Sequence, residues 1–140
     1  MPYSFLPHTA DAKFQADGTT LEEAFSSAAE AMFSVMADPA KVKPVYEEKI
    51  SVEGADKKAL LYAFLEELLF LLDTKKFLLN RIISISIAIK EDKLILDATA
   101  AGDIDLEQYE IHGEVKAVTY NEMEITEEEG KVTVQVVVDL

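Results

Sequence analysis

Two aspartates and a terminal carboxylate are the residues of this sequence best suited to chemistry. The segment 131–138 alternates as a β-strand does and stops at Asp139 and Leu140. The side chain of Asp139 and the terminal carboxylate of Leu140 would gather four carboxyl oxygens at one strand tip. Oxygens this close repel one another unless a cation or a basic partner lies among them. We therefore predict a hard-metal site at this tip; a merely solubilised strand end is the alternative.

Asp11 is the carboxylate that we expect to complete this site. It follows His8, Thr9 and Ala10 and stands at the entry of an alternating segment, 12–16, which should form a strand. Calcium is our first candidate for the ion. Magnesium and manganese remain alternatives because all three ions accept oxygen ligands.

Composition limits the partners that this chain can have. Its 140 residues are 49% hydrophobic, which predicts a single domain, 1–140, with a real core. The 27 acidic residues outnumber the 13 basic ones and give a net charge of −14. This charge argues against strong direct binding of nucleic acid and favours cations or basic protein surfaces. The absence of cysteine removes disulfides, zinc-thiolate sites and thiol nucleophiles.

The cellular location is predicted from what the sequence lacks. The first residues have neither a basic start nor an apolar run of useful length, so we expect no signal peptide. The most apolar segment, 59–72, is too short to span a bilayer and carries Glu66 and Glu67 at its middle. We expect a cytoplasmic protein with no membrane partner.

Periodicity predicts an α+β fold, in which a largely antiparallel β-sheet packs with two main α-helices in a single domain. Helical spacing follows a capping box at Thr20 and Glu23, and Asp56 should cap the second helix. That helix is apolar nearly all round, so we expect it to be buried between layers. The segments with strand-like alternation are 12–16, 46–52, 82–89, 94–100, 114–120, 123–126 and 131–138.

Two of these segments carry more specific predictions. In the hairpin 82–100, one strongly buried face should hold the four isoleucines at alternate positions, Ile83, Ile85, Ile87 and Ile89. The acidic segment 103–110 lacks clean periodicity and should cross the fold irregularly. We interpret it as a solvated loop and not as a second metal site.

Few residues of this sequence could act in catalysis. His8 and His112 are the only histidines, no serine lies in a nucleophile elbow, and the five glycines are scattered, so no phosphate loop exists. We predict no catalytic residue. Lys116 stands out because it interrupts a strand expected to be buried, on the face of Val118 and Tyr120. It either snorkels to the sheet edge or meets a carboxylate cluster or phosphate.

Four segments, taken together, resemble the archease family, and they follow the family's order over nearly the whole chain. They are His8 to Asp11, Glu66 to Asp73, Glu114 to Tyr120, and the final Val-Val-Asp-Leu. Archeases are small acidic cofactors of the GTP-dependent RNA ligase that joins tRNA exon halves. The resemblance implies that this protein is an activator and not an enzyme. It would promote transfer of GMP onto the ligase's active-site histidine and support repeated turnover.

The resemblance also implies roles for individual residues. The family's metal-binding carboxylates match Asp11 and Asp139, with Leu140 nearby. After its Thr-Tyr pair this chain has Asn121 where the family often has histidine, so it offers no imidazole at that position. The residues implied in ligase activation are His8, Glu67, His112, Glu114 and Lys116.

Two other classes of function remain open from the sequence. A metal-dependent phosphoesterase would use Asp11, Asp139 and a histidine, and would turn over phosphoesters by itself. An acidic interaction module would bind a basic partner with no metal role. Charge reversal on its acidic surface would then abolish function, whereas Asp139→Asn would not.

Overall fold

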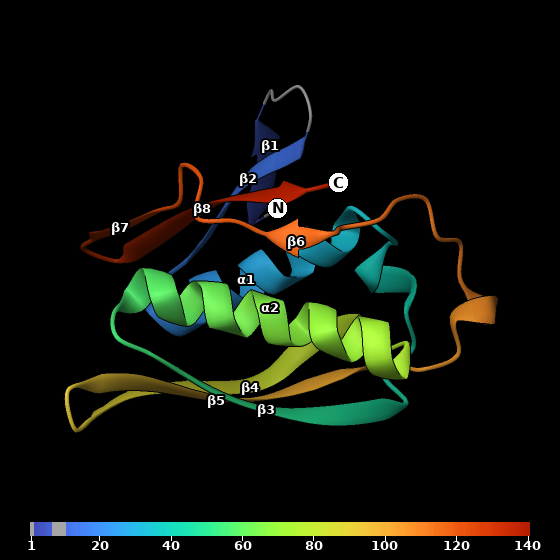
Figure 1. Ribbon diagram of the computed structural model, residues 1–140, viewed down its shortest axis with the longest axis horizontal. Coiled ribbons are helices and arrows are strands. Elements are labelled where there is room, and N and C mark those ends of the chain that lie inside the picture. Colours follow the sequence, from blue (N-terminus) through green and yellow to red (C-terminus); the bar gives the residue numbers. More distant parts are fainter. Residues whose placement is uncertain (1, 7–10) are drawn as a thin grey trace.

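Two antiparallel sheets enclose two helices in the computed structural model of this chain (Figure 1). The structure describes residues 2–6 and 11–140, so the predicted site residue His8 lies outside the described residues. The helices are α1 (Leu21–Ser34) and α2 (Lys57–Lys75). The strands are β1 (Tyr3–Leu6), β2 (Asp11–Gly18), β3 (Tyr46–Gly54), β4 (Leu78–Lys90), β5 (Lys93–Asp103), β6 (Ala117–Val118), β7 (Glu124–Glu128) and β8 (Lys131–Asp139). The predicted α+β fold with two main helices is confirmed.

Strand β8 occupies the middle of the larger sheet. The order is β1-β2-β8-β6, and β7 also pairs with β8; the smaller sheet has the order β3-β5-β4. Every strand pair is antiparallel. Gln135 and Val137 are buried as well as the valines that alternate with them, so β8 is covered on both faces. This two-sided burial explains why Val137 is apolar although it lies on the face opposite to the alternating valines.

Side-chain caps start both helices, as predicted. The hydroxyl of Thr20 accepts from the N–H of Glu23 at 3.1 Å, and Asp56 accepts from the N–H of Ala59 at 2.8 Å. The reciprocal half of the capping box differs from the prediction. The Glu23 carboxylate accepts from the N–H and the hydroxyl of Thr19, one residue before the cap. These bonds lower the pKa of Glu23.

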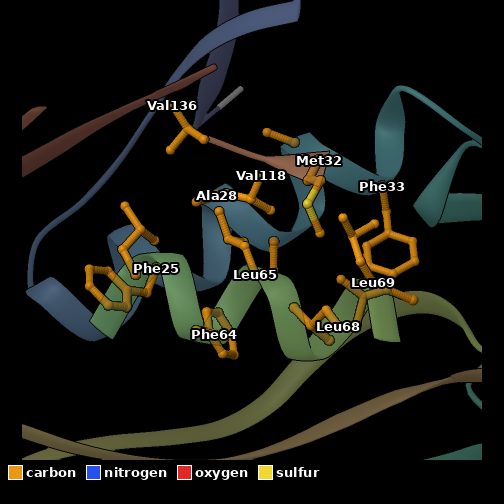
Figure 2. Close-up of a cluster of buried hydrophobic side chains, with 14 of the residues drawn as sticks. Phe25, Ala28, Met32, Phe33, Phe64, Leu65, Leu68, Leu69, Val118 and Val136 are labelled. Atoms are coloured by element: carbon orange, nitrogen blue, oxygen red, sulfur yellow. The ribbon is translucent and has the colours of Figure 1, made fainter. Parts of the chain in front are cut away.

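The core lies where the helices meet between the two sheets (Figures 1 and 2). Phe25 of α1 stacks on Phe64 of α2, with ring centroids 6.3 Å apart, and both side chains are fully buried. Removing a ring of this kind costs about 3–5 kcal/mol. The prediction that α2 is buried is right for most of the helix but wrong at Phe70, which is 57% exposed. No helix within the described residues is long and apolar enough to cross a membrane.

The predicted isoleucine face of β4 is only partly correct. The β4–β5 register shifts between Ile82 and Ser84, so Ile83 is the extra residue of a β-bulge. Ile82 therefore takes the helix-facing position that we expected for Ile83. Ile85 and Ile87 are half-buried, whereas Ile89 is 80% exposed beyond the helices. The predicted turn is present, and Glu91 and Asp92 have the positive φ angles of a type I′ hairpin.

The strand predicted at 114–120 is also shorter than expected. Within 114–120, only Ala117 and Val118 are register partners of β8 residues, and the buried side chains are those of Val115 and Val118. A spacing of three does not fit an extended strand, so Lys116 and Tyr120 do not share a buried face with Val118. Strand β1 was missed altogether, because Tyr3–Leu6 is too short to show a reliable alternation.

Candidate functional site

Asp11 and Asp139 lie opposite each other across the β2–β8 pair. They are register partners, and directly opposed residues of an antiparallel pair project to the same face. Asp11 is half-buried, with its Oδ1 atom buried, and Asp139 is exposed. The predicted convergence of these two carboxylates at one strand tip is therefore supported by the strand register. Leu140 follows directly and is 45% exposed.

Strand β6 attaches a third element to the same tip. Ala117 is the register partner of Asp139 on the other side of β8, and the N–H of Lys116 donates to the carbonyl of Asp139 at 2.8 Å. Thr119 extends the attachment through its N–H and its hydroxyl, which both donate to the carbonyl of Val137. The backbone of Lys116 is thus fixed beside Asp139, while its side chain is exposed.

A groove of about 440 Å³ lies at the end of α2, and Lys116 is one of its lining residues. The rest of its polar lining comes from Asp73 of α2, from Lys76, the residue that caps α2, and from Glu114. Glu114 and Lys116 therefore line one groove, and the backbone bond of Lys116 to Asp139 joins this groove to the tip. His112 lines a separate pocket, but its N–H donates to the carbonyl of Met36 at 2.9 Å, and Met36 lines the groove.

The two glutamates of α2 face different surroundings. Tyr62, one turn before Glu66, stacks on Tyr120 with ring centroids 4.3 Å apart and an angle of 8° between the rings. Burial, followed by the charge of Glu66, raises the pKa of Tyr62. Glu67 lies about 100° further round the helix, away from Tyr62. The structure thus places Glu66, and not Glu67, on the side of Tyr120, while the role expected of Glu67 stays a prediction.

The carboxylates at the tip suit a hard divalent cation by the chemistry of their donors. Asp11, Asp139 and the terminal carboxylate expected at Leu140 offer oxygen alone, which favours calcium, magnesium or manganese over zinc. Within residues 2–6 and 11–140, no group of three or more His, Cys, Asp or Glu side chains is placed to hold a metal. A third ligand from Leu140 stays a prediction.

A polar network that we did not predict covers the outer face of the larger sheet beside the tip. Lys13, two residues after Asp11, pairs with Glu122 at 3.0 Å. Gln15 donates to Gln135 at 3.0 Å, and Gln135 donates to the carbonyl of Glu122 at 2.8 Å. The alternation of Lys13 and Gln15 with apolar residues is the sequence signal for a polar face, but it does not identify the partners.

The acidic segment 103–110 is irregular after β5, as predicted, but its first residue, Asp103, ends β5 and is not solvated. Asp103 is only 5% exposed and accepts from the N–H groups of Ile104 and Asp105. The hydroxyl of Tyr109 donates to its Oδ2 atom at 2.7 Å. This last bond is the main cause of the lowered pKa of Asp103. With these donors bound, Asp103 stabilises the crossing segment.

Fold and site together define a class of small α+β protein with two carboxylates and a lysine at one strand tip. The chain matches the model of the Archease protein family over residues 3–140. It is 43% identical to protein archease of Methanothermobacter thermautotrophicus over 138 residues, covering 99% of this chain and 98% of the relative. Protein archease of Pyrococcus furiosus is 41% identical over 135 residues, covering 95% and 94%. The chain belongs to the archease family.

Solved structures agree with this assignment. The solution structure of Methanobacterium thermoautotrophicum protein 1598 superposes with a TM-score of 0.88 at 42% identity and covers 99% of each chain. The crystal structure of a Thermotoga maritima archease, described as a possible chaperone, gives a TM-score of 0.61 at 14% identity, with coverage of 96% and 94%. At that identity, the second likeness shows the fold alone.

Proposed function

We propose that this chain is a protein cofactor of a GTP-dependent tRNA-splicing RNA ligase. It would accelerate the transfer of GMP onto the ligase's active-site histidine and support repeated turnover, without joining RNA itself. The observation that carries the proposal is the cross-strand pairing of Asp11 with Asp139, to which the backbone of Lys116 is bonded, in a chain of the archease family.

The residues at the tip have distinct tasks in this proposal. Asp11, Asp139 and the terminal carboxylate of Leu140 would hold a divalent cation, with calcium as the first candidate. When bound, such an ion neutralises charge on phosphate groups. The register of β2 with β8 keeps the two aspartates together without movement of the backbone. Lys116 offers a compact ammonium that can orient a phosphate or a carboxylate of the ligase.

The charge of the whole chain favours a basic partner surface. A net charge of −14 attracts a positively charged protein and speeds the encounter between them. The ligase, which binds RNA and GTP, is expected to carry positive charge around its active site. The acidic cofactor would dock there with Asp11, Asp139 and Lys116 facing the ligase.

The test is a time course of ligase guanylylation with radiolabelled GTP, using a small amount of this chain relative to ligase. The wild type should accelerate GMP attachment, and Asp139→Asn should slow it about tenfold or more because it removes one charge from the tip. Asp97→Asn, an exposed change in the smaller sheet, should act as the wild type does. Calorimetric titration with calcium provides a second readout, in which Asp139→Asn should lose binding.

The same experiment separates the other classes of function. Hydrolysis of phosphoesters by the chain without ligase would identify a phosphoesterase. Full stimulation by Asp139→Asn would identify an interaction module with no metal role. No acceleration by the wild type would contradict the proposed function itself.

A further inference from the structure

The outer edge of β4 is an open template for another strand. Among the described residues, β4 pairs with β5 alone, in the order β3-β5-β4. Apart from its bonds to β5, the segment 82–90 makes no backbone hydrogen bond to the rest of the described chain. The opposite edge of this sheet is protected, because β3 carries charged side chains at Glu47, Lys49 and Glu53. From Ile82 to Ile89, β4 carries none.

The hairpin turn fixes which backbone groups point outward. Lys90 and Lys93 flank a two-residue turn and are register partners, so this pair exchanges both backbone hydrogen bonds. Every second residue back along β4 from Lys90 is bonded in the same way, so Ser86 directs its N–H and C=O groups at β5. Ile85 and Ile87 therefore direct theirs outward, away from the sheet. Their side chains pack toward the helices and that of Ser86 is exposed, so no bulky side chain blocks an incoming strand on the outer face.

The sequence of this edge is symmetric about Ser86. Small residues, Ser84 and Ala88, lie two positions to either side, and isoleucines lie between. We propose that two copies of this chain associate by antiparallel pairing of their β4 strands about a two-fold axis at Ser86. Ile85 of each copy then exchanges backbone hydrogen bonds with Ile87 of the other. The two smaller sheets become one continuous sheet of six strands.

Exposed apolar side chains near the edge fit this register. Ile89 is 80% exposed and Ile83, the bulge residue, is 43% exposed. Pairing about Ser86 brings Ile89 of one copy opposite the bulge at Ile82 and Ile83 of the other, where Ile82 lies on the same face as Ile89; this removes apolar surface from water. The aspartate tip lies in the larger sheet, on the far side of the helices from β4 (Figure 1). Association through β4 therefore leaves the proposed ligase-activating tip exposed, and the proposal does not depend on that function.

Charge explains why this edge, and not another surface, would meet a second copy. Two chains of net charge −14 repel each other, but repulsion between exposed charges is screened beyond about 8 Å at physiological ionic strength. The segment from Ile82 to Ile89 contributes no charged side chain to this contact, and the groove along Ile82 to Ile85 is lined by Asp17, Glu23 and Lys131 from other elements. Added salt should therefore strengthen the dimer, whereas it should weaken any complex with a basic partner.

The test places a charge on the axis, with a closely matched control. Ser86 and Ser51 are both exposed, and both are register partners of Asp97, from opposite sides. Ser86→Glu sets two carboxylates against each other in the dimer, with Asp97 of each copy beside them, and should raise its dissociation constant at least about tenfold. Ser51→Glu, on the β3 edge, should leave it unchanged. Analytical ultracentrifugation over a range of protein and salt concentrations measures both, and thermal melts confirm folding.

A cross-link tests the register independently. The chain contains no cysteine, so Ser86→Cys would supply its only thiol. The two Ser86 residues would form a non-hydrogen-bonded pair with a Cα separation of about 4.5 Å, which permits a disulfide. Mild oxidation should therefore yield a covalent dimer from Ser86→Cys and not from Ser51→Cys. A wild type that stays monomeric at every salt concentration, or a dimer that survives Ser86→Glu, would overturn the proposal.

Discussion

At the scale of single residues, Lys116 has a backbone and a side chain with separate roles. Its N–H donates to Asp139, which fixes the segment at the tip, while its ammonium is exposed in the groove with Glu114. Because Lys116→Met keeps the backbone bond, we expect stability to change by less than about 0.5 kcal/mol. The rate of ligase guanylylation should fall about tenfold or more if the ammonium contacts a phosphate or carboxylate of the ligase.

Two further variants make this prediction specific. Lys116→Arg should restore only part of the stimulation, because a planar guanidinium does not replace a compact charge. Lys131→Met, at the far end of β8, removes an equal charge and should stimulate as the wild type does. A folded Lys116→Met variant with full stimulation would show that Lys116 has only a structural role.

Because the hydroxyl of Tyr109 donates to the carboxylate of Asp103, we expect the stability of the fold to depend on pH. The hydroxyl of Tyr109, followed in importance by backbone N–H donors, holds the pKa of Asp103 below its ordinary value of 3.8 in the folded chain. Ionised Asp103 therefore contributes stability above that pH and loses it as the pH falls through the lowered value. Tyr109→Phe should cost about 1–2 kcal/mol at pH 7, and the cost should shrink below about pH 4.

Urea unfolding of the wild type and Tyr109→Phe between pH 7 and pH 3 measures this difference. Tyr120→Phe is a suitable control because the Tyr120 ring is exposed and keeps its stack on Tyr62. A difference between wild type and Tyr109→Phe that stays constant over this range would contradict the assigned role of Asp103.

At the scale of the elements, the cap of α2 matters because this helix joins both sheets. The carboxylate of Asp56 accepts from the N–H of Ala59, and α2 packs on β3 and on β6. Asp56→Ala should lower the free energy of unfolding by about 1 kcal/mol. Asp73→Ala, near the other end of the helix, removes the same charge without removing a cap and should cost less. Equal losses in urea unfolding of the two variants would show that general charge, and not capping, is responsible.

The strands show where periodicity gives a wrong result. The isoleucines of β4 alternate through Ile83, but the bulge at that residue shifts the phase of the strand. A bulge depends on how β5 and the helices fit against β4, so it leaves no trace in the alternation itself. In the same way, β6 is limited to Ala117 and Val118 by its meeting with the end of β8.

At the scale of the whole molecule, the net charge of −14 dominates encounters with other macromolecules. We expect the chain alone to bind tRNA exon halves weakly at physiological salt, because it has no surplus of basic residues to displace counterions. Fluorescence anisotropy with labelled RNA, with and without the ligase, measures this. Tight binding of RNA in the absence of ligase would contradict the proposal that the ligase binds the RNA and this chain only activates the ligase.

The sequence by itself determined the features that depend on near neighbours. The caps at Thr20 and Asp56, the turn after Lys90 and the alternation of β8 each arise from residues within a few positions of one another. Asp11 and Asp139 were each recognisable as carboxylates at the end of an alternating segment, but their pairing depends on the register of β2 with β8. The family resemblance was likewise readable from four short segments.

The tertiary structure alone decided which distant residues meet. The contacts of Lys13 with Glu122 and of Gln15 with Gln135 join residues 109 and 120 positions apart. Such pairs depend on strand order and register, which many sequences of the same periodicity satisfy differently. Local hydrogen bonding specifies the elements, whereas strand order and register within the larger sheet bring the two carboxylates of the site together.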